Sequence, residues 1–516
     1  MDPLTVAPVM LENRSFDKIV VGAAASPTTK GRRLITLVGW SVLAACTTVD
    51  VSVPPSGVAV PASFTAVDAG ASGVAGAAVR TDLTRWWVAL GDPTLTQLID
   101  AGLQANADIR IALDRVQEAR SVITQAESAL YPTVIATGGI GQSKLDQRVP
   151  AITLPSGAPL PVTLPNSVAL PTTSLGTGGF AAAWEVDIFG SRRSDAEAAR
   201  QAALGYEERL HGAQMMVVSD IASNYFEARS VARRANVLQR SIATAQRLQR
   251  YAQGRFDAGQ ATRTHIDRAR SVVEALESQR QPLNLLLGVR LRRLAVLTGQ
   301  APQALTALPP LSGPLPIPDG LPQVLPSEVL ERRPDVRGTA NLVRAQAAKL
   351  GSAKAALFPK FTIGFLAQDG HIDISGLPKT GGTLTSWGVG VTLPLFEAGR
   401  IRANIAAQDA RLDAAAAQYE QAVLAALEDV ENAYSARHAF DSRTTLLAQA
   451  TRSAQDSATH AHRLYEEGSG LLQAVLEAQL QALQSEDELI QAETARAVTT
   501  VLLYKAIGGG WVPSKL

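Results

Sequence analysis

The segment Trp184-Glu-Val-Asp-Ile-Phe-Gly190 decides the fold, because a strand-like pattern before it changes to a helical pattern after it. The helical pattern then continues to about residue 256. A helix of that length, with its rise of 1.5 Å per residue, is about 95 Å long, far longer than a compact domain needs. The sequence therefore predicts a helix that reaches across a distance.

The same arrangement occurs a second time. Leu393-Pro-Leu-Phe-Glu-Ala-Gly-Arg400 precedes another long helical pattern. Self-similarity of this kind indicates one structural unit built twice. Gly190, Asp220, Tyr225, Gly259 and Gly299 return 209 residues later as Gly399, Asp429, Tyr434, Gly468 and Gly508. Upstream the offset is 227 residues, which pairs Asp108, Arg110 and Pro132 with Asp335, Arg337 and Pro359.

Domain boundaries follow from this repeat. The offsets differ by 18 residues because the first copy has an extra Pro-rich loop between Pro132 and Gly190. We expect a first structural repeat at residues 81–301, a Pro-rich connector at 302–326, a second repeat at 327–511 and a C-terminal tail at 512–516.

Each long helix is expected to fold back on itself. Breaks at Asp257-Ala-Gly259 and Glu466-Glu-Gly468-Ser-Gly470 interrupt the helical pattern. Two helical hairpins result. The predicted helices cover residues 192–256 and 262–299 in the first copy and 400–465 and 471–507 in the second, after two shorter helices between Asp82 and Leu130.

Each copy also carries two strand-like segments rich in Thr, Val, Ile and Gly. Each segment has about the 9–11 residues that a tilted strand needs to cross a bilayer. The segments cover residues 133–142, 178–188, 360–370 and 385–395.

Four strands cannot close a membrane barrel, because single-chain barrels begin at about eight strands. An open sheet edge cannot face lipid either, since its unpaired backbone groups each cost several kcal/mol. Three chains would supply twelve strands for a shared membrane β-barrel and enough long helices for a hollow cylinder. The fold class is therefore mainly α with a membrane β-barrel. A soluble coiled-coil protein with two small β-hairpins is the alternative.

The N-terminal region resembles an export signal. Three basic residues precede an apolar stretch, Leu34 to Ala45, that is shorter than the roughly 20 residues of a membrane-spanning helix. The stretch ends in Leu43-Ala-Ala-Cys46, which resembles the lipobox of bacterial lipoproteins. A signal cleavage site beside an incidental cysteine is the alternative.

We therefore expect a signal region at residues 1–45, lipid attachment at Cys46 and a flexible, lipidated tether at 46–80. Residues 1–29 lack signal character and are consistent with an upstream start codon.

Composition excludes several classes of protein. The 516 residues include 48 Lys and Arg against 47 Asp and Glu, whereas a nucleic-acid-binding protein would show a basic excess. A single cysteine excludes disulfides within the chain and a Cys-rich metal site. The six histidines lack metal-ligand spacing, and no nucleophile elbow, P-loop or dinucleotide motif stands in a suitable context. We expect no metal, no cofactor beyond covalent lipid on Cys46, and no enzymatic activity.

Eight motifs, spread over about residues 85–512, are similar to those of the outer-membrane efflux factor family, the TolC-like and OprM-like channels of tripartite pumps. Each motif alone is weak, but all eight in order, with the lipobox, are strongly specific. The lipobox and the Gly-Gly-Gly-Trp ending most resemble the lipoprotein (NodT-type) branch. The motifs are Trp86-Trp87, Trp184-Glu-Val-Asp-Ile-Phe-Gly190, Arg255-Phe-Asp-Ala-Gly259, Leu294-Ala-Val-Leu-Thr-Gly299, Arg332-Arg-Pro-Asp-Val336, Leu393-Pro-Leu-Phe-Glu-Ala-Gly-Arg400, Leu476-Glu-Ala-Gln479 and Tyr504-Lys-Ala-Ile-Gly-Gly-Gly-Trp511.

The resemblance implies a homotrimer in the cell outer membrane. A twelve-stranded barrel would lie in outer-membrane lipid, and a helical barrel would cross the periplasm to a periplasmic adaptor and an inner-membrane pump. The chain would be a passive conduit for drugs or other small solutes, because the pump supplies the energy. A type I protein secretion outlet is the alternative function, and a structural coiled-coil lipoprotein without a pore is another.

The resemblance also assigns roles at the hairpin tips. It implies adaptor docking at Arg255, Phe256, Gly259, Gly468 and Gly470. It implies a periplasmic gate at Asp267, Tyr465 and Glu477, where threefold symmetry turns each acid into a ring of like charges. The simpler interpretation is that the glycines are turn residues and the acids lie on solvated helix faces.

Two positions depart from the family pattern. Glu477 stands where the family has aspartate, and Gly470 stands where some members have a tip arginine that partners the tyrosine. We therefore expect the contacts that hold this gate closed, which we call the latch, to be looser.

Overall fold

The computed structural model divides the chain into two units, Met1–Thr48 and Val49–Leu516, and only the second is described below. The predicted signal region and Cys46 lie outside the described residues. The described residues are 49, 51–65, 82–144, 146–148, 167–169, 172–309, 317, 320, 322 and 324–511.

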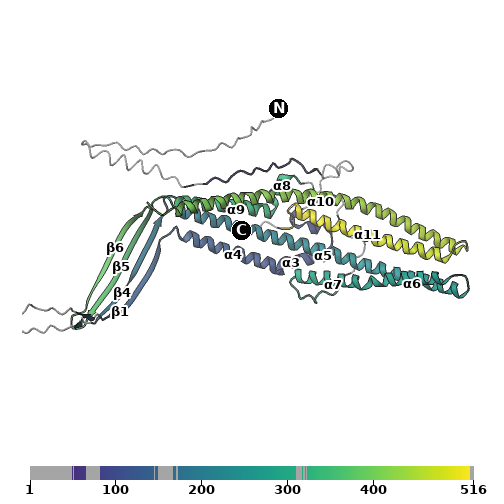
Figure 1. Ribbon diagram of the computed structural model, residues 1–516, viewed down its shortest axis with the longest axis horizontal. Helices are drawn as coiled ribbons and strands as arrows, with labels where there is room; N and C mark the ends of the chain where they lie inside the picture. The colour runs from purple at the N-terminus through teal and green to yellow at the C-terminus, as the bar shows by residue number, and fades with distance from the viewer. Residues whose placement is uncertain are drawn as a thin grey trace, which may run out of the picture. The chain divides into compact units, whose positions relative to one another are not determined.

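Two long helical hairpins dominate the second unit (Figure 1). Helix α5 (Ser191–Asp257) and helix α10 (Arg400–Glu466) each contain 67 residues. The return arm of the first hairpin is α6 (Arg263–Ser278) followed by α7 (Arg280–Leu297), and that of the second is α11 (Leu472–Ala506). These bounds confirm the predicted hairpins to within one or two residues at each end, apart from the division between α6 and α7.

Shorter helices pack beside the long ones. Helix α4 (Ala107–Ser128) and its repeat-related partner α9 (Pro334–Ala355) both contain 22 residues. The 3₁₀ helix η1 (Leu83–Leu90) and helix α3 (Pro93–Ala105) precede α4, and the short α8 (Pro326–Arg332) precedes α9. Helix α9 lies between α5 and α10 and so joins the two copies.

Repeat-related glycines bound the long helices with matching backbone angles. All of them adopt a positive φ, a region that glycine enters without the steric penalty of a side chain. The φ values are 82° and 85° at Gly190 and Gly399, 70° and 76° at Gly259 and Gly468, and 74° and 79° at Gly299 and Gly508.

Four strands form one antiparallel sheet at the end of the unit remote from the hairpin tips (Figure 1). The order is β1-β4-β5-β6, so each copy supplies one hairpin and β4 pairs with β5 across the two copies. The strands are β1 (Thr133–Ser143), β4 (Thr173–Val186), β5 (Lys360–Ile374) and β6 (Thr380–Thr392), with β2 (Asp146–Arg148) and β3 (Ser167–Ala169) pairing as a short separate sheet.

The four predicted strands occur in the predicted order, but three of them are placed imperfectly, and β2 and β3 pair within the segment that was predicted as a loop. Strands β4 and β6 begin about five residues earlier than predicted, and β5 ends four residues later. Cross-strand pairing continues into these ends. The added residues of β4 and β6 are rich in Gly and Thr, which carry a weak strand signal.

The two faces of the four-stranded sheet differ in polarity. Directly paired residues share a face, as Ala182, Phe365 and Trp387 do across three strands. That face is apolar and exposed, with Trp387 78% accessible. The opposite face is richer in Thr, Ser, Gly and Gln. The apolar face carries Val134, Ala136, Ile140, Phe180, Ala182, Trp184, Ile363, Phe365, Trp387, Val389 and Val391.

One predicted helix is divided in the structure. We predicted a continuous helix at 262–299, but α6 ends at Ser278 and α7 begins at Arg280. Pro282 explains the break, because proline lacks the N–H that would bond to the Ser278 carbonyl, and its ring clashes with that carbonyl. The repeat-related residue is Gln491, and α11 is continuous there.

The largest apolar core lies midway along the hairpins, where motif aromatics meet. Trp86 stacks on Tyr504 with ring centroids 4.8 Å apart. The Tyr225 hydroxyl donates to Asp92, which also caps helix α3. The repeat-related Tyr434 hydroxyl donates to the carbonyl of Pro322 in the connector. Equivalent tyrosines thus hold non-equivalent segments against the core.

The described part of the predicted tether is not free. Residues 51–65 lie extended against the second copy, and Phe64 is 3% exposed. The Gly57 N–H donates to Glu420 at 2.8 Å, and Val51 and Val58 pack on apolar clusters of α9 and α10. The prediction of flexibility rested on small and proline residues, whose composition does not reveal a docking surface elsewhere in the chain.

Candidate functional site at the hairpin tips

Both tips close with the same backbone geometry. In the first, the N–H of Gly259 donates to the Phe256 carbonyl at 2.9 Å and that of Gln260 donates to Arg255 at 2.7 Å. In the second, the N–H of Gly468 donates to the Tyr465 carbonyl at 3.0 Å. These bonds satisfy carbonyls that a helix end leaves free. The predicted docking glycines are therefore also turn residues.

Gly470 is closely packed. A Cβ atom at this position would lie 3.0 Å from the backbone nitrogen of Tyr465 and 3.1 Å from Leu464 atoms. The Gly470 N–H also donates to the Leu464 carbonyl at 2.8 Å. A side chain here would require Tyr465 or Leu464 to shift by a few tenths of an ångström.

The other predicted docking residues offer a charge and an apolar ring beside the first tip. Arg255 donates to the carbonyl of Gln260 at 3.2 Å, which crosses the tip. Phe256 next to it is 39% exposed. An exposed aromatic ring beside a guanidinium that a hydrogen bond holds in place is the kind of surface that binds another protein.

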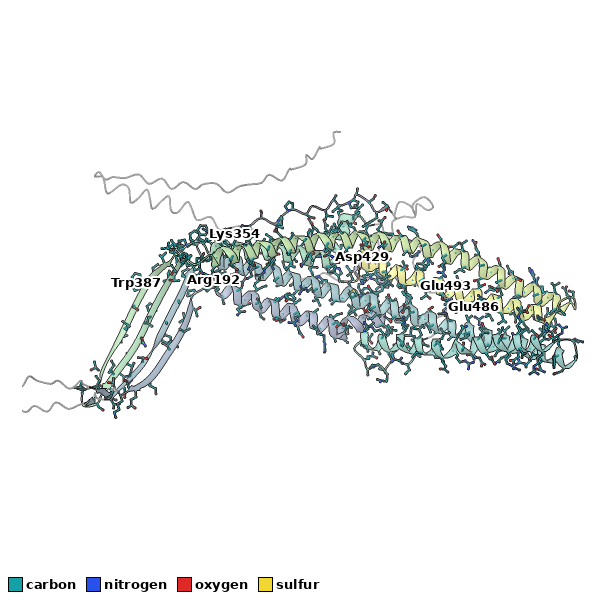
Figure 2. The ribbon with its side chains drawn as sticks, in the orientation of Figure 1. Arg192, Lys354, Trp387, Asp429, Glu486 and Glu493 are labelled. Carbon is teal, nitrogen blue, oxygen red and sulfur yellow. The ribbon has the colours of Figure 1, made fainter. Side chains whose placement is uncertain are left out.

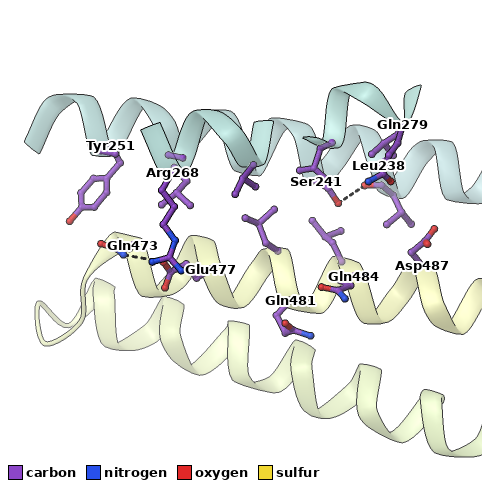
Figure 3. A pocket seen from close by; sticks show the side chains of 18 of the residues that line it. Leu238, Ser241, Tyr251, Arg268, Gln279, Gln473, Glu477, Gln481, Gln484 and Asp487 are labelled. Atoms are coloured by element: carbon purple, nitrogen blue, oxygen red, sulfur yellow. Dashed lines mark hydrogen bonds between the residues drawn. The ribbon is translucent and has the colours of Figure 1, made fainter. Parts of the chain in front are cut away.

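A groove of about 780 Å³ opens between the hairpins near these tips (Figure 3). Its first-hairpin wall includes the apolar residues Leu238, Leu248 and Leu276. Arg268 points across the groove toward Gln473 and Glu477 on α11. The α11 wall is mainly polar, with Gln473, Glu477, Gln481, Gln484, Glu488 and Gln491.

The three predicted gate residues lie on different helices near the tips. Asp267 on α6 is exposed and lies 3.9 Å from Arg270. Glu477 on α11 accepts a hydrogen bond from Gln473 at 3.0 Å. Tyr465 in the last turn of α10 is 43% exposed. Among the described residues, no hydrogen bond or ion pair joins these three side chains to one another, so the gate remains a prediction.

A ladder of polar contacts joins the two hairpins behind the tips. Arg233 donates to Glu493 at 2.7 Å, Arg240 pairs with Glu486, and Arg247 donates to Gln479 at 3.1 Å. We call these three contacts the arginine ladder; Figure 2 labels its two glutamates on α11. Arg234 adds an ion pair with Asp487 at 2.8 Å.

The sequence predictions missed this ladder. Its signal is nevertheless present, because the arginines recur every seven residues on α5 and their partners every seven residues on α11. Seven residues are close to two helical turns, so each set forms one stripe. What the spacing does not reveal is that the two stripes face each other.

The described part of the chain contains no cluster of three or more His, Cys, Asp or Glu side chains arranged to hold a metal ion. Within that part, no helix combines the length and the apolar character that crossing a membrane would require.

Comparison with protein families matches this chain to the outer membrane efflux protein family over residues 98–300 and 325–509. The solvent efflux pump outer membrane protein SrpC of Pseudomonas putida is 26% identical over 435 residues, which cover 82% of this chain and 87% of that protein. The pyoverdine export outer membrane protein OpmQ of Pseudomonas aeruginosa is 28% identical over 460 residues, which cover 88% and 92%.

Solved structures of outer-membrane channels are also similar. The channel OprN matches with a TM-score of 0.76 and 26% identity, over 90% of this chain and all of that chain. The open state of the MtrE channel of Neisseria gonorrhoeae matches with a TM-score of 0.73 and 26% identity, over 89% and 98%.

Proposed function

This chain belongs to the outer membrane efflux protein family, and from this premise we propose that three copies form a passive conduit for small molecules. It is the outer-membrane component of an efflux system. The proposal adds the trimer, its partners and its cargo. The observation that carries it is a four-stranded sheet with two free edges and one exposed apolar face.

The free edges argue for closure by further copies. Strands β1 and β6 lie at the edges, and every pair inside the sheet is antiparallel. With an even number of strands per chain, β6 of one copy meets β1 of the next in antiparallel sense as well. Such head-to-tail contacts close into a ring, and lipid favours a closed sheet because an open edge leaves backbone groups unpaired. Three copies give the twelve-stranded barrel that the sequence predicts.

The helical layer supports the same association. Helices α4 and α7 border one side of the layer and α10 borders the other (Figure 1). Both sides expose large apolar residues that copies in a ring would cover. These include Ile111 and Val122 on α4, Leu285 and Val289 on α7, and Leu424 and Leu446 on α10.

The experiment for the trimer combines two measurements on the purified protein. We expect a band of three times the chain mass on unboiled gels that boiling converts to one chain, together with ion conductance in planar bilayers. A single-chain band without conductance would overturn the proposal and favour a coiled-coil lipoprotein without a pore.

We infer that a periplasmic adaptor docks on the tips around Phe256, Gly259, Gly468 and Gly470, and that the adaptor links the conduit to an inner-membrane pump. Exposed Phe256 and the adjacent groove support this role. The photo-crosslinker p-benzoylphenylalanine in place of Phe256 should capture the adaptor in intact cells. The same group in place of Val88, which is 49% exposed on η1, should not. Equal capture at both positions would remove the tip assignment.

Asp267, Tyr465 and Glu477 are proposed as the gate of this entrance. In a ring of three copies, each acid becomes three like charges around the axis, which attract cations and repel one another. The double variant Tyr465→Phe with Asp267→Ala should conduct more than the wild type in planar bilayers. Unchanged conductance would count against this latch.

The names of the relatives support small solutes as the exported substrates, since the two reported above are named for solvent efflux and pyoverdine export. Deletion of the gene should raise intracellular accumulation of apolar antibiotics, and the wild-type gene should restore export. If secretion of one protein is lost while antibiotic accumulation is unchanged, the type I outlet becomes the better assignment.

Lipid attachment at Cys46 is proposed from the sequence alone. Mass spectrometry of the N-terminal peptide should find acyl chains on Cys46. The variant Cys46→Ala should lack them.

A further inference from the structure

Each residue of the arginine ladder has an equivalent in the other copy of the internal repeat, and these equivalents lie on the outer sides of the chain. Residues of α5 reappear in α10 209 residues later, and residues of α11 have counterparts in α6 and α7 209 residues earlier. In the proposed ring, α10 of one copy meets α6 and α7 of the next copy as α5 meets α11 within one chain. The inference therefore rests on the proposed trimer.

The projected positions lie at the surface of the single chain. The ladder arginines Arg233, Arg240 and Arg247 correspond to Ser442, Gln449 and Asp456, and their partners Glu493, Glu486 and Gln479 correspond to Asn284, Glu277 and Arg270. All six corresponding residues are exposed in the single chain. The repeat thus places two exposed polar stripes on opposite sides of the molecule.

We propose that these stripes form a second ladder between neighbouring copies. Asp456 of one copy pairs with Arg270 of the next copy, Gln449 with Glu277, and Ser442 with Asn284. Every rung is complementary: the first is an ion pair, the second joins an amide to a carboxylate, and the third joins a hydroxyl to an amide. No rung sets two like charges against each other.

The two ladders differ in where their ion pairs lie. Within a chain, the ion pairs are the two rungs farther from the tips, and the rung nearest the tips is the neutral-partner contact of Arg247 with Gln479. Between copies, the only ion pair is the rung nearest the tips. Within this second ladder, the ion pair therefore lies closest to the entrance.

This arrangement bears on the proposed gate. Arg270 lies 3.9 Å from Asp267 in the single chain, a long contact between half-exposed side chains. Asp456 of the neighbouring copy would draw Arg270 toward the seam. Asp267 would then be left to act in the ring of acids. Glu277 has a similar local partner, Gln246, at 3.3 Å.

Paired cysteines test the register. We expect a short bismaleimide to link copies in intact cells for Asp456→Cys with Arg270→Cys, and for Ser442→Cys with Asn284→Cys. The exchanged combinations, 456 with 284 and 442 with 270, are out of register by 14 residues, or about 21 Å of helix. They should show only the background of the wild type, whose single native cysteine is Cys46.

A charge exchange tests the ion pair independently. Asp456→Arg should lower the fraction of trimer that survives on unboiled gels, and adding Arg270→Asp should restore it. Absence of any trimer in the wild type would sink the proposed assembly itself. A trimer in which the exchanged combinations link as well as the matched ones, or in which the second charge change gives no recovery, would overturn the ladder alone.

Discussion

Trp511 stacks on His211 with ring centroids 4.2 Å apart and planes inclined by 20°. The guanidinium of Arg337 lies 5.3 Å from the same Trp511 ring. Glu208 connects the two neighbours, since it pairs with Arg337 at 2.6 Å and lies 3.3 Å from the imidazole of His211. The end of the described chain is thus held between α5 and α9, one from each copy.

Trp511→Ala should destabilise the protein by about 3–5 kcal/mol, the usual cost of emptying a buried aromatic site. Trp511 is only 8% exposed, so its removal leaves a cavity inside the protein. Thermal unfolding followed by circular dichroism measures the effect. Trp511→Phe keeps a ring on His211 and should lose distinctly less. Equal losses in the two variants would mean that stacking contributes little.

Asp487→Asn should cost about 0.5–1 kcal/mol, because it leaves Arg234 without its carboxylate partner. Both side chains are only 25–29% exposed, so solvent screens this pair incompletely. Chemical denaturation of the purified protein gives the number. Glu118→Gln breaks a pair in which both side chains are 61% exposed, and it should change stability little. A larger loss in this control than in Asp487→Asn would refute the ranking.

Two glycines near the first tip should respond to alanine with opposite sign. A Cβ atom at Gly254 or Gly259 would meet no atom within 4 Å. Gly254 lies inside α5, so alanine should stabilise by roughly 0.5–1 kcal/mol through helix propensity. Gly259 has a φ of 70°, and alanine there should cost about 1–2 kcal/mol. Thermal unfolding of both variants measures the two effects, and a change of melting temperature of the same sign in both would contradict this account.

Stability should fall at alkaline pH in part through Tyr434. Burial raises the pKa of the Tyr434 phenol from 10.0 to about 12. Because the folded-state pKa lies above the unfolded value, this contribution is complete below about pH 10 and is lost as the pH rises through about 12. Tyr434→Phe should flatten the decline of unfolding free energy in that window. Tyr131→Phe, at a residue 68% exposed, should not. Parallel curves for the wild type and Tyr434→Phe would exclude the linkage.

Arginine should have different effects on the two faces of the sheet. Val389 lies on the apolar face, where arginine facing lipid costs about 2–4 kcal/mol near the bilayer midplane. Val389→Arg should therefore reduce the amount of protein recovered in the outer-membrane fraction. Ser386 lies on the opposite face, so Ser386→Arg should assemble normally and alter ion selectivity in planar bilayers. Normal assembly of Val389→Arg would reverse the assignment of faces.

Local signals were enough to place the main helices. Gly190 and Gly259, both with a positive φ, lie just before and just after α5. The left-handed Gly259 ends the helical hydrogen-bond pattern, and both glycines stand in the sequence with their repeat partners. The prediction of one helix across α6 and α7 was wrong because it followed the spacing of apolar residues, which continues past Pro282. The proline itself indicates the break.

The sequence by itself determined that the chain is one unit built twice, with two long hairpins and four strands. The hairpins and strands depend on residues a few positions apart, and the duplication is found by comparing the chain with itself at a fixed offset. The tertiary structure decided which elements meet. Strand β4 pairs with β5 across the copies, and Arg240 on α5 forms an ion pair with Glu486 on α11. Tyr225 donates a hydrogen bond to Asp92, whereas its equivalent Tyr434 donates one to the Pro322 carbonyl. Periodicity shows that a helix or strand has a face to bury, but the partner of that face depends on contacts between residues far apart in the chain.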